Sequence, residues 1–186
     1  EHEDLYFTAQ LDTCFGEDIE TGMSEDYSWS FIENNIDSDA LMNKYNANNI
    51  VYMMYFNTSY ENDVACCTRN YYENMPYPYE ICYIFARDIW GEQCPAIFAH
   101  EMLHTFGAPD LYCGDYYYGI LEDFPVYADR IQLNDIMRIC GDVYTGEMYK
   151  ERISNEITDI TAYYIGWTDY SYLVKLWGFG KSEHSY

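Results

Sequence analysis

Basic residues are scarce in this sequence, where 9 Lys and Arg stand against 32 Asp and Glu and give a formal net charge of −23. Binding to nucleic acid or to an anionic membrane surface requires clustered positive charge. The basic residues are instead dispersed between Lys44 and Lys181. The sequence therefore predicts no nucleic-acid partner. Solubility is the simplest explanation of the acidity, and a preference for cationic substrates is the alternative.

Several other features are absent. No uninterrupted apolar run approaches the roughly 18 to 20 residues that a membrane helix needs, so we expect no membrane insertion. There is no internal repeat, no Pro-rich or Gly/Ser-rich linker, and no GxSxG, Walker or dinucleotide-binding motif. We therefore expect one monomeric domain over residues 1–186, with an N-terminal subdomain of about 1–107 and a C-terminal subdomain of about 108–186.

Seven cysteines are many for a cytosolic chain of this size, and none forms the CxxC pairs of a structural zinc site. They are Cys14, Cys66, Cys67, Cys82, Cys94, Cys113 and Cys140. This pattern favours a secreted protein with disulfides. The connectivity stays open, although adjacent Cys66 and Cys67 are expected to have different partners.

The N-terminal half contains patterns of both helix and strand. Apolar residues at irregular helical spacing over Asp26–Tyr45, interrupted by Asn and Asp, predict a broken helix. Two short β-branched and aromatic runs, Ile50–Phe56 and Glu80–Phe85, predict buried strands. The expected fold class is therefore α/β (α+β), with a small twisted mixed sheet and a backing helix.

A stronger helix signal follows at Cys94–Phe106. Pro95 suits the first turn of a helix, and Gly107 stands where a helix commonly ends in a left-handed residue. The segment 107–129 is rich in Gly, Tyr, Asp and Pro without periodicity, which predicts a long ordered loop. A final helix is expected within Ser154–Gly166, and the rest of the C-terminal half should be irregular.

Residues 100 to 104 of the predicted helix read HEMLH. A spacing of four places the imidazoles of His100 and His104 on one face, where both can bind one cation such as zinc. Glu101 stands beside them as the general base for a metal-bound water. Two helical histidines can also lie on a solvated face or satisfy core hydrogen bonds. The apolar residues around this pair favour the metal site.

The run continues as HEMLHTFGAPD. A glycine at position 107 lets the chain reverse, so that Asp110 can return to the metal as the third ligand. Asp110 could instead be an ordinary turn residue. The alternative third ligand is Glu122, supplied by a second helix, although Pro125 and the missing periodicity argue against that helix. Calcium bound by Glu17-Asp18 or by the loop 110–115 is a further, less favoured option.

The motif HExxHxxGxxD resembles the extended zinc-binding motif of metzincin-type metallopeptidases in which aspartate is the third ligand, such as the snapalysin-like and immune-inhibitor-A-like peptidases. The run GAPDLY at 107–112 is similar to the loop after the helix in the latter group. The resemblance implies a metzincin-like zincin fold and a Met-turn. Asn134-Asp135-Ile136-Met137 is the candidate, with Met137 packing near the metal. Met is also a common core filler.

These patterns predict a secreted zinc endopeptidase that cleaves a protein or peptide substrate. The resemblance implies that the substrate adds a strand to the sheet edge. Tyr144 is one of many tyrosines that could stabilise a transition state. The alternative function is a secreted protein- or glycan-binding module with a structural metal. Glu101 discriminates between them, because a structural site needs no free carboxylate beside two of its ligands.

Overall fold

Helices and strands are mixed along the chain, which confirms the coarse α/β class. The computed structural model describes residues 25–47, 50–59, 66–69, 80–88, 91–115 and 118–180. The chain divides into two units, Glu1–Tyr52 and Met53–Tyr186. Each is described separately below.

The described residues of the first unit include the helices α2 (Glu25–Asn35) and α3 (Ser38–Tyr45). They are separated at Asp37, whose side chain accepts a hydrogen bond of 2.9 Å from the backbone N–H of Ala40. An aspartate in this position satisfies a backbone donor of the first helical turn, so it starts a new helix rather than continuing the old one. The prediction of a broken helix is confirmed.

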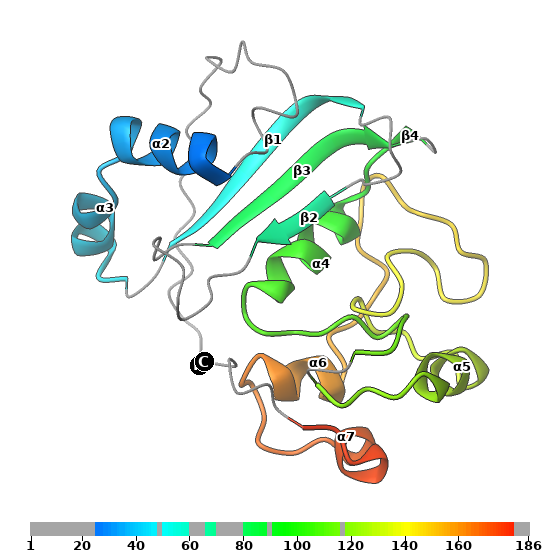
Figure 1. Cartoon of the computed structure of the whole chain (residues 1–186). Helices are drawn as coiled ribbons and strands as arrows, with labels where there is room; N and C mark the ends of the chain where they lie inside the picture. Colours follow the sequence, from blue (N-terminus) through cyan, green and yellow to red (C-terminus); the bar gives the residue numbers. More distant parts are fainter. Residues whose placement is uncertain are drawn as a thin grey trace. The chain divides into compact units, whose positions relative to one another are not determined.

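A four-stranded sheet follows, in the order β1-β3-β2, with β4 pairing at the end of β3. The strands are β1 (Val51–Ser59), β2 (Cys66–Arg69), β3 (Glu80–Asp88) and β4 (Gly91–Glu92). Both β2 and β4 are antiparallel to β3, while β1 runs parallel to it (Figure 1). Every residue of Ile81–Phe85 is buried, as expected for an uninterrupted apolar run in a central strand. Both predicted strands are present, but only β3 is buried as expected, because Tyr55 of β1 is 58% exposed.

Helix α4 (Pro95–His104) packs against β2 and β3. Its buried residues are Ala96, His100 and Leu103, which share one face of a helix. The predicted helix is therefore confirmed, with Pro95 in its first turn. The face that packs into the protein also carries the first candidate ligand.

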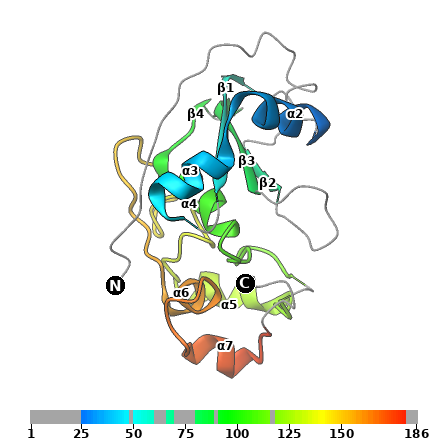
Figure 2. The ribbon, with the colours of Figure 1, turned by 90° about the vertical axis from the view of Figure 1, so that its left-hand side faces the viewer.

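Three short helices lie beyond α4, as Figure 2 shows: α5 (Asp123–Arg130), α6 (Asp159–Tyr164) and α7 (Tyr172–Trp177). Their apolar side chains share one core with the end of α4 and the loop after it. The core includes Leu103, Leu111, Phe124, Ala128, Met137, Ile160, Tyr164, Leu173, Val174 and Phe179. This packing fixes the segments that follow α4 around the candidate site.

Two predictions about this part were wrong in detail. The segment 107–129 is not a loop throughout, because α5 begins at Asp123 and carries Pro125 within its first turn. A proline there removes only a backbone N–H that has no helical partner, so it does not prevent the helix. The helix expected within Ser154–Gly166 is shorter, has Thr158 rather than Ser154 as its N-cap, and is followed by α7.

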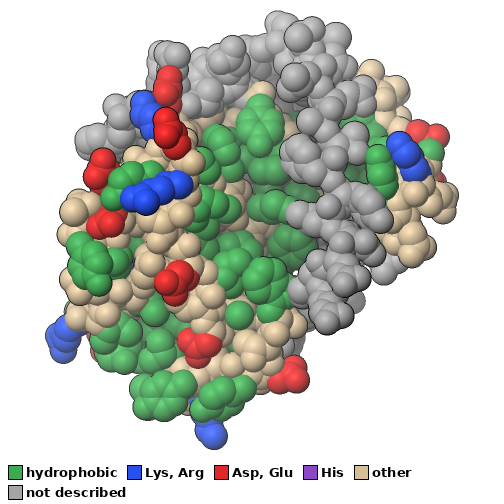
Figure 3. Space-filling model, turned by 180° about the vertical axis from the view of Figure 1, so that it is seen from behind, with side chains coloured by type: hydrophobic (Ala, Val, Ile, Leu, Met, Phe, Trp, Pro, Cys, Tyr) green, Lys and Arg blue, Asp and Glu red, His purple; other side chains and the backbone are tan. Residues whose placement is uncertain are grey.

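Within the described ranges, no helix is both long and apolar enough to cross a membrane. On the face shown in Figure 3, Lys and Arg side chains are scattered among acidic and apolar ones. Clustered positive charge is therefore not seen on this face.

Candidate metal centre

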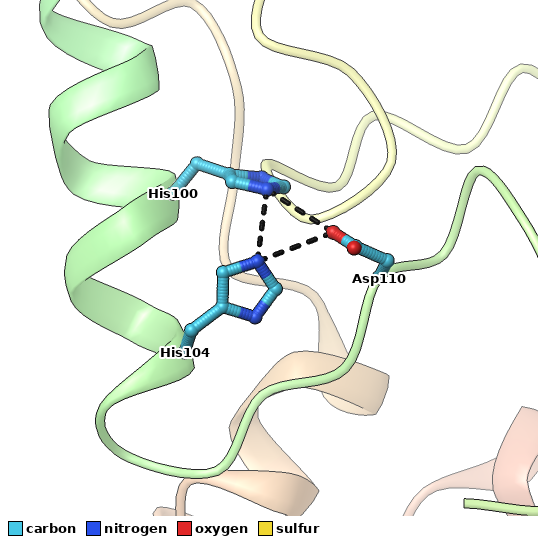
Figure 4. Close-up of side chains that lie close together, drawn as sticks. All are labelled: His100, His104 and Asp110. Carbon is cyan, nitrogen blue, oxygen red and sulfur yellow. Dashed lines mark hydrogen bonds and ion pairs between the residues drawn. The ribbon is translucent and has the colours of Figure 1, made fainter. Parts of the chain in front are cut away.

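The structure brings together His100 and His104 of α4 and Asp110 of the loop after it (Figure 4). The Nε2 atoms of the two imidazoles are 3.1 Å apart. Asp110 Oδ1 lies 3.1 Å from His100 Nε2 and 3.2 Å from His104 Nε2. One atom from each predicted ligand thus occupies a corner of a nearly equilateral triangle.

The opposite nitrogen of each ring faces a backbone carbonyl. His100 Nδ1 is 3.0 Å from the Ile136 oxygen, and His104 Nδ1 is 2.8 Å from the Ala108 oxygen. A carbonyl oxygen can only accept, so each Nδ1 must carry the proton that it donates. In the neutral rings both Nε2 lone pairs then point at the buried Asp110 Oδ1, to which Nε2 can donate a hydrogen bond only when its ring is protonated. Three converging acceptors require a cation or extra protons between them.

The donor set and its spacing fit zinc. Ligand atoms about 2.0 to 2.2 Å from a zinc ion in near-tetrahedral geometry are separated by about 3.3 Å. The observed separations of 3.1 to 3.2 Å are close to this value. Calcium and magnesium prefer oxygen ligands, whereas two imidazoles and one carboxylate suit zinc. Among the described residues the group contains three ligands, which leaves room for water or substrate.

The three groups shift one another's pKa values. Burial alone would lower the pKa of His100, but hydrogen bonding to Asp110 and to Cys140 outweighs it and raises the pKa to about 10. For His104, burial is likewise outweighed by Asp110, and its pKa is also raised. Burial would raise the pKa of Asp110, yet the two histidines hold it well below its usual range. The metal-free cluster therefore attracts protons, as a cation site should.

Asp110 returns to the helix because the chain reverses at Gly107. The φ angle of Gly107 is 90°, a left-handed conformation that favours glycine. The N–H of Gly107 donates to the His104 carbonyl at 2.9 Å, and the N–H of Ala108 donates to the Leu103 carbonyl at 3.1 Å. This turn aims both the Ala108 carbonyl and the Asp110 side chain at His104.

The candidate Met-turn completes the surroundings of His100. Met137 is fully buried, and its carbonyl accepts a hydrogen bond of 2.9 Å from the N–H of Leu111. The preceding residue, Ile136, supplies the carbonyl that faces His100 Nδ1. The predicted segment therefore lies beside the cluster, and it orients a ligand through its backbone.

The sequence analysis missed the role of Asp135. Its carboxylate is fully buried and accepts hydrogen bonds from the backbone of Met137 and from both the backbone and the hydroxyl of Thr158. The Thr161 hydroxyl donates to it at 2.7 Å. Asp135 thus fixes the candidate Met-turn to the start of α6. No local pattern links Asp135 to residues more than twenty positions later, so no sequence signal could have found this contact.

Glu101 and Tyr112 border the cluster. Glu101 is half-buried, and its charge acts on both His104 and Tyr112. The ring of Tyr112 is stacked on that of His100, with centroids 6.1 Å apart and an angle of 27°. Burial first and the Asp110 charge second raise the pKa of Tyr112, which keeps its phenol protonated. Tyr112 is nevertheless 56% exposed, and Tyr144 is more exposed still at 74%.

Glu122 does not join the histidines. It precedes α5, and its carboxylate lies against Gly114, where an added Cβ atom would be 2.6 Å from Glu122 Oε1. Calcium stays a prediction: Glu17-Asp18 lies outside the described residues, and Asp110 of the other acidic loop belongs to the histidine cluster.

The disulfide prediction is also untested as a whole. Cys82, Cys94, Cys113 and Cys140 are unbridged in this structure. Cys14 and the side chains of Cys66 and Cys67 lie outside what the structure describes.

Comparison of the chain with models of protein families, with curated proteins and with solved structures finds no match.

Proposed function

We propose that this chain is a zinc-dependent endopeptidase. The observation that carries the proposal is the convergence of His100 Nε2, His104 Nε2 and Asp110 Oδ1 within 3.1 to 3.2 Å, while both Nδ1 atoms face carbonyl oxygens. A structural zinc site is usually closed by four protein ligands, whereas a catalytic site keeps one position open. The three-ligand group and the adjacent Glu101 support the catalytic alternative.

Each residue has a definite task in this proposal. Bound zinc would lower the pKa of a coordinated water and polarise the scissile carbonyl. Glu101 takes the proton of the attacking water and later delivers it to the leaving amine. The protonated phenol of Tyr112, stacked on His100, is a hydrogen-bond donor for the oxygen that becomes negative during attack.

We also propose that the fold is of the metzincin type. Support comes from the order of the elements: a small mixed sheet, the ligand helix α4 packed against it, the reversal at Gly107, and a tight turn at Met137 beside the first ligand. In that plan an extended peptide substrate pairs with the edge of the sheet.

The test is a comparison of Glu101→Gln with Glu151→Gln, an exposed glutamate remote in sequence. Glu101→Gln should bind one zinc per chain and lose at least about 100-fold in casein or peptide cleavage, which is the usual contribution of a general base. Glu151→Gln should cleave normally, and a chelator should abolish the activity of the unaltered chain. Undiminished cleavage by Glu101→Gln, or cleavage indifferent to the chelator, would refute the proposal.

A further inference from the structure

Cys94 and Cys140, far apart in the sequence, lie side by side at the base of the ligand helix. Cys94 is the N-cap residue of α4 and is 1% exposed. Its Sγ donates a hydrogen bond of 3.3 Å to the backbone carbonyl of Cys140. We propose that these two residues form a disulfide that joins the start of α4 to the chain after the Met-turn.

The environment of Cys140 supports this pairing. Its Sγ lies 3.7 Å from the carbonyl oxygen of Ile136, the same oxygen that faces His100 Nδ1. The Cys94 sulfur already contacts the backbone of Cys140. In the proposed bridge, both side chains rotate away from their present carbonyl partners so that the two sulfurs meet. The other described cysteines are placed differently: Cys82 is buried in β3 and donates to the Glu101 carbonyl, while Cys113 is exposed in the loop after Asp110.

The bridge closes a segment whose ends are 46 positions apart. The candidate zinc ligands and the proposed general base all lie inside it: His100, Glu101, His104, Asp110 and Glu122. Such a bridge restricts the unfolded chain and holds α4 against the Met-turn. It also removes the Cys140 sulfur both from its hydrogen bond to the Ile136 carbonyl and from its interaction with His100.

The bond forms by thiol–disulfide exchange with a small disulfide oxidant such as oxidised glutathione. One cysteine first forms a mixed disulfide and releases one reduced glutathione. The thiolate of the other cysteine then attacks, and a second reduced glutathione leaves. Two thiols of the protein are oxidised, their two protons pass to the two released glutathione thiols, and one oxidant disulfide is reduced. Zinc takes no part, so this inference can fail or hold independently of the proposed function.

The direct test is peptide mapping of the full chain equilibrated with oxidised and reduced glutathione. Free thiols are alkylated before digestion without a reductant. The expected result is one cross-linked species that contains Cys94 and Cys140 and disappears on reduction. Alkylation of both residues, or linkage of either one to another cysteine, would overturn the pairing.

A second measurement separates a bridge from thiols that merely pack. Under oxidising conditions Cys94→Ser and Cys140→Ser should each lower the midpoint of thermal unfolding by on the order of 10 °C, and the double variant should lower it no further. Cys113→Ser is the matched control and should leave the midpoint unchanged. Excess dithiothreitol should bring the unaltered chain close to the variants. Equal differences with and without dithiothreitol would contradict the bridge.

Discussion

The two imidazoles of the candidate centre are oriented by different parts of the chain. The Nδ1 atom of His104 faces the carbonyl of Ala108, four residues later, whereas that of His100 faces Ile136, 36 residues later. The first arrangement is local and follows from a helix that ends in a glycine turn. The second exists only once the C-terminal half has folded. One half of the centre is thus encoded in a short motif, and the other half depends on tertiary structure.

Each half has its own critical residue. The local half depends on Gly107, whose φ of 90° turns both Ala108 and Asp110 back toward His104. The distant half depends on Asp135, whose buried carboxylate fixes the Met-turn that carries Ile136. Variants of these two residues should therefore disturb different ligands.

Asp135→Ala should have the largest effect. It removes the common acceptor of Met137, Thr158 and Thr161, and leaves their buried donors without a partner. Loss of such a buried network costs about 3 to 5 kcal/mol of the free energy of unfolding. Zinc affinity should fall as well, by about 10- to 100-fold, because His100 loses its orientation. Denaturant unfolding and competitive zinc titration measure the two quantities.

Asp142→Ala is the matched control for this experiment. Asp142 also accepts several hydrogen bonds, from the backbone of Tyr144 and from the backbone and hydroxyl of Thr145, but it does so within one exposed turn. It should change stability less than Asp135→Ala and leave zinc affinity unaltered. If both variants bound zinc as tightly as the unaltered chain does, Asp135 would not be needed to orient His100 for metal binding.

The stability of the metal-free protein should fall as the pH rises. The pKa of His100 is raised from 6.5 to about 10, so the folded state binds a proton more tightly than the unfolded state. This contribution is complete below pH 6.5 and is lost as the pH approaches 10. Asp110 affects stability in the acidic range. Because its pKa is lowered in the folded state, its carboxylate stabilises the fold above pH 3.8, and this contribution is lost in stronger acid.

Bound zinc should prevent the loss of stability that the metal-free protein shows as the pH rises. Zinc binds neutral imidazole, so protons compete with it and its affinity should increase as the pH rises. The unfolding midpoint measured between pH 6 and 10 should decline in a chelator and stay level or rise with saturating zinc. Parallel curves in the two conditions would show that the histidine cluster does not bind the metal.

Gly107→Ala should have a smaller effect, confined to the local half. A side chain in a left-handed conformation costs about 1 to 2 kcal/mol. Gly166, with φ of 79° and open space around an added Cβ, is the matched control, and Gly166→Ala should lose a similar free energy of unfolding. Only Gly107→Ala should also weaken zinc binding. Equal zinc affinity in both variants would mean that the turn does not position Asp110.

The same division between local and distant contacts explains what the sequence could predict. Helix α4, the reversal at Gly107 and the convergence of Asp110 with the histidines follow from spacing, because all lie within a few helical turns. The start of α5 was missed because Pro125 was interpreted as a helix breaker, although it occupies the first turn. The hydrogen bond between Asp135 and Thr161 could not be predicted, because neither segment contains a sequence pattern that indicates the other as its partner.

Tyr112 offers the most selective prediction. It lies close to the ligand helix in the sequence, yet it contacts His100, the ligand that is oriented by the distant residue Ile136. Its ring stacks on His100, and its hydroxyl interacts with Asp110. Tyr112→Phe keeps the ring and should change the free energy of unfolding and the zinc affinity little. If the phenol donates to the developing oxyanion, kcat should fall by about 10- to 100-fold with KM nearly unchanged. Tyr144→Phe, at a residue 74% exposed, should alter neither constant. A rise in KM alone would assign Tyr112 to substrate binding instead.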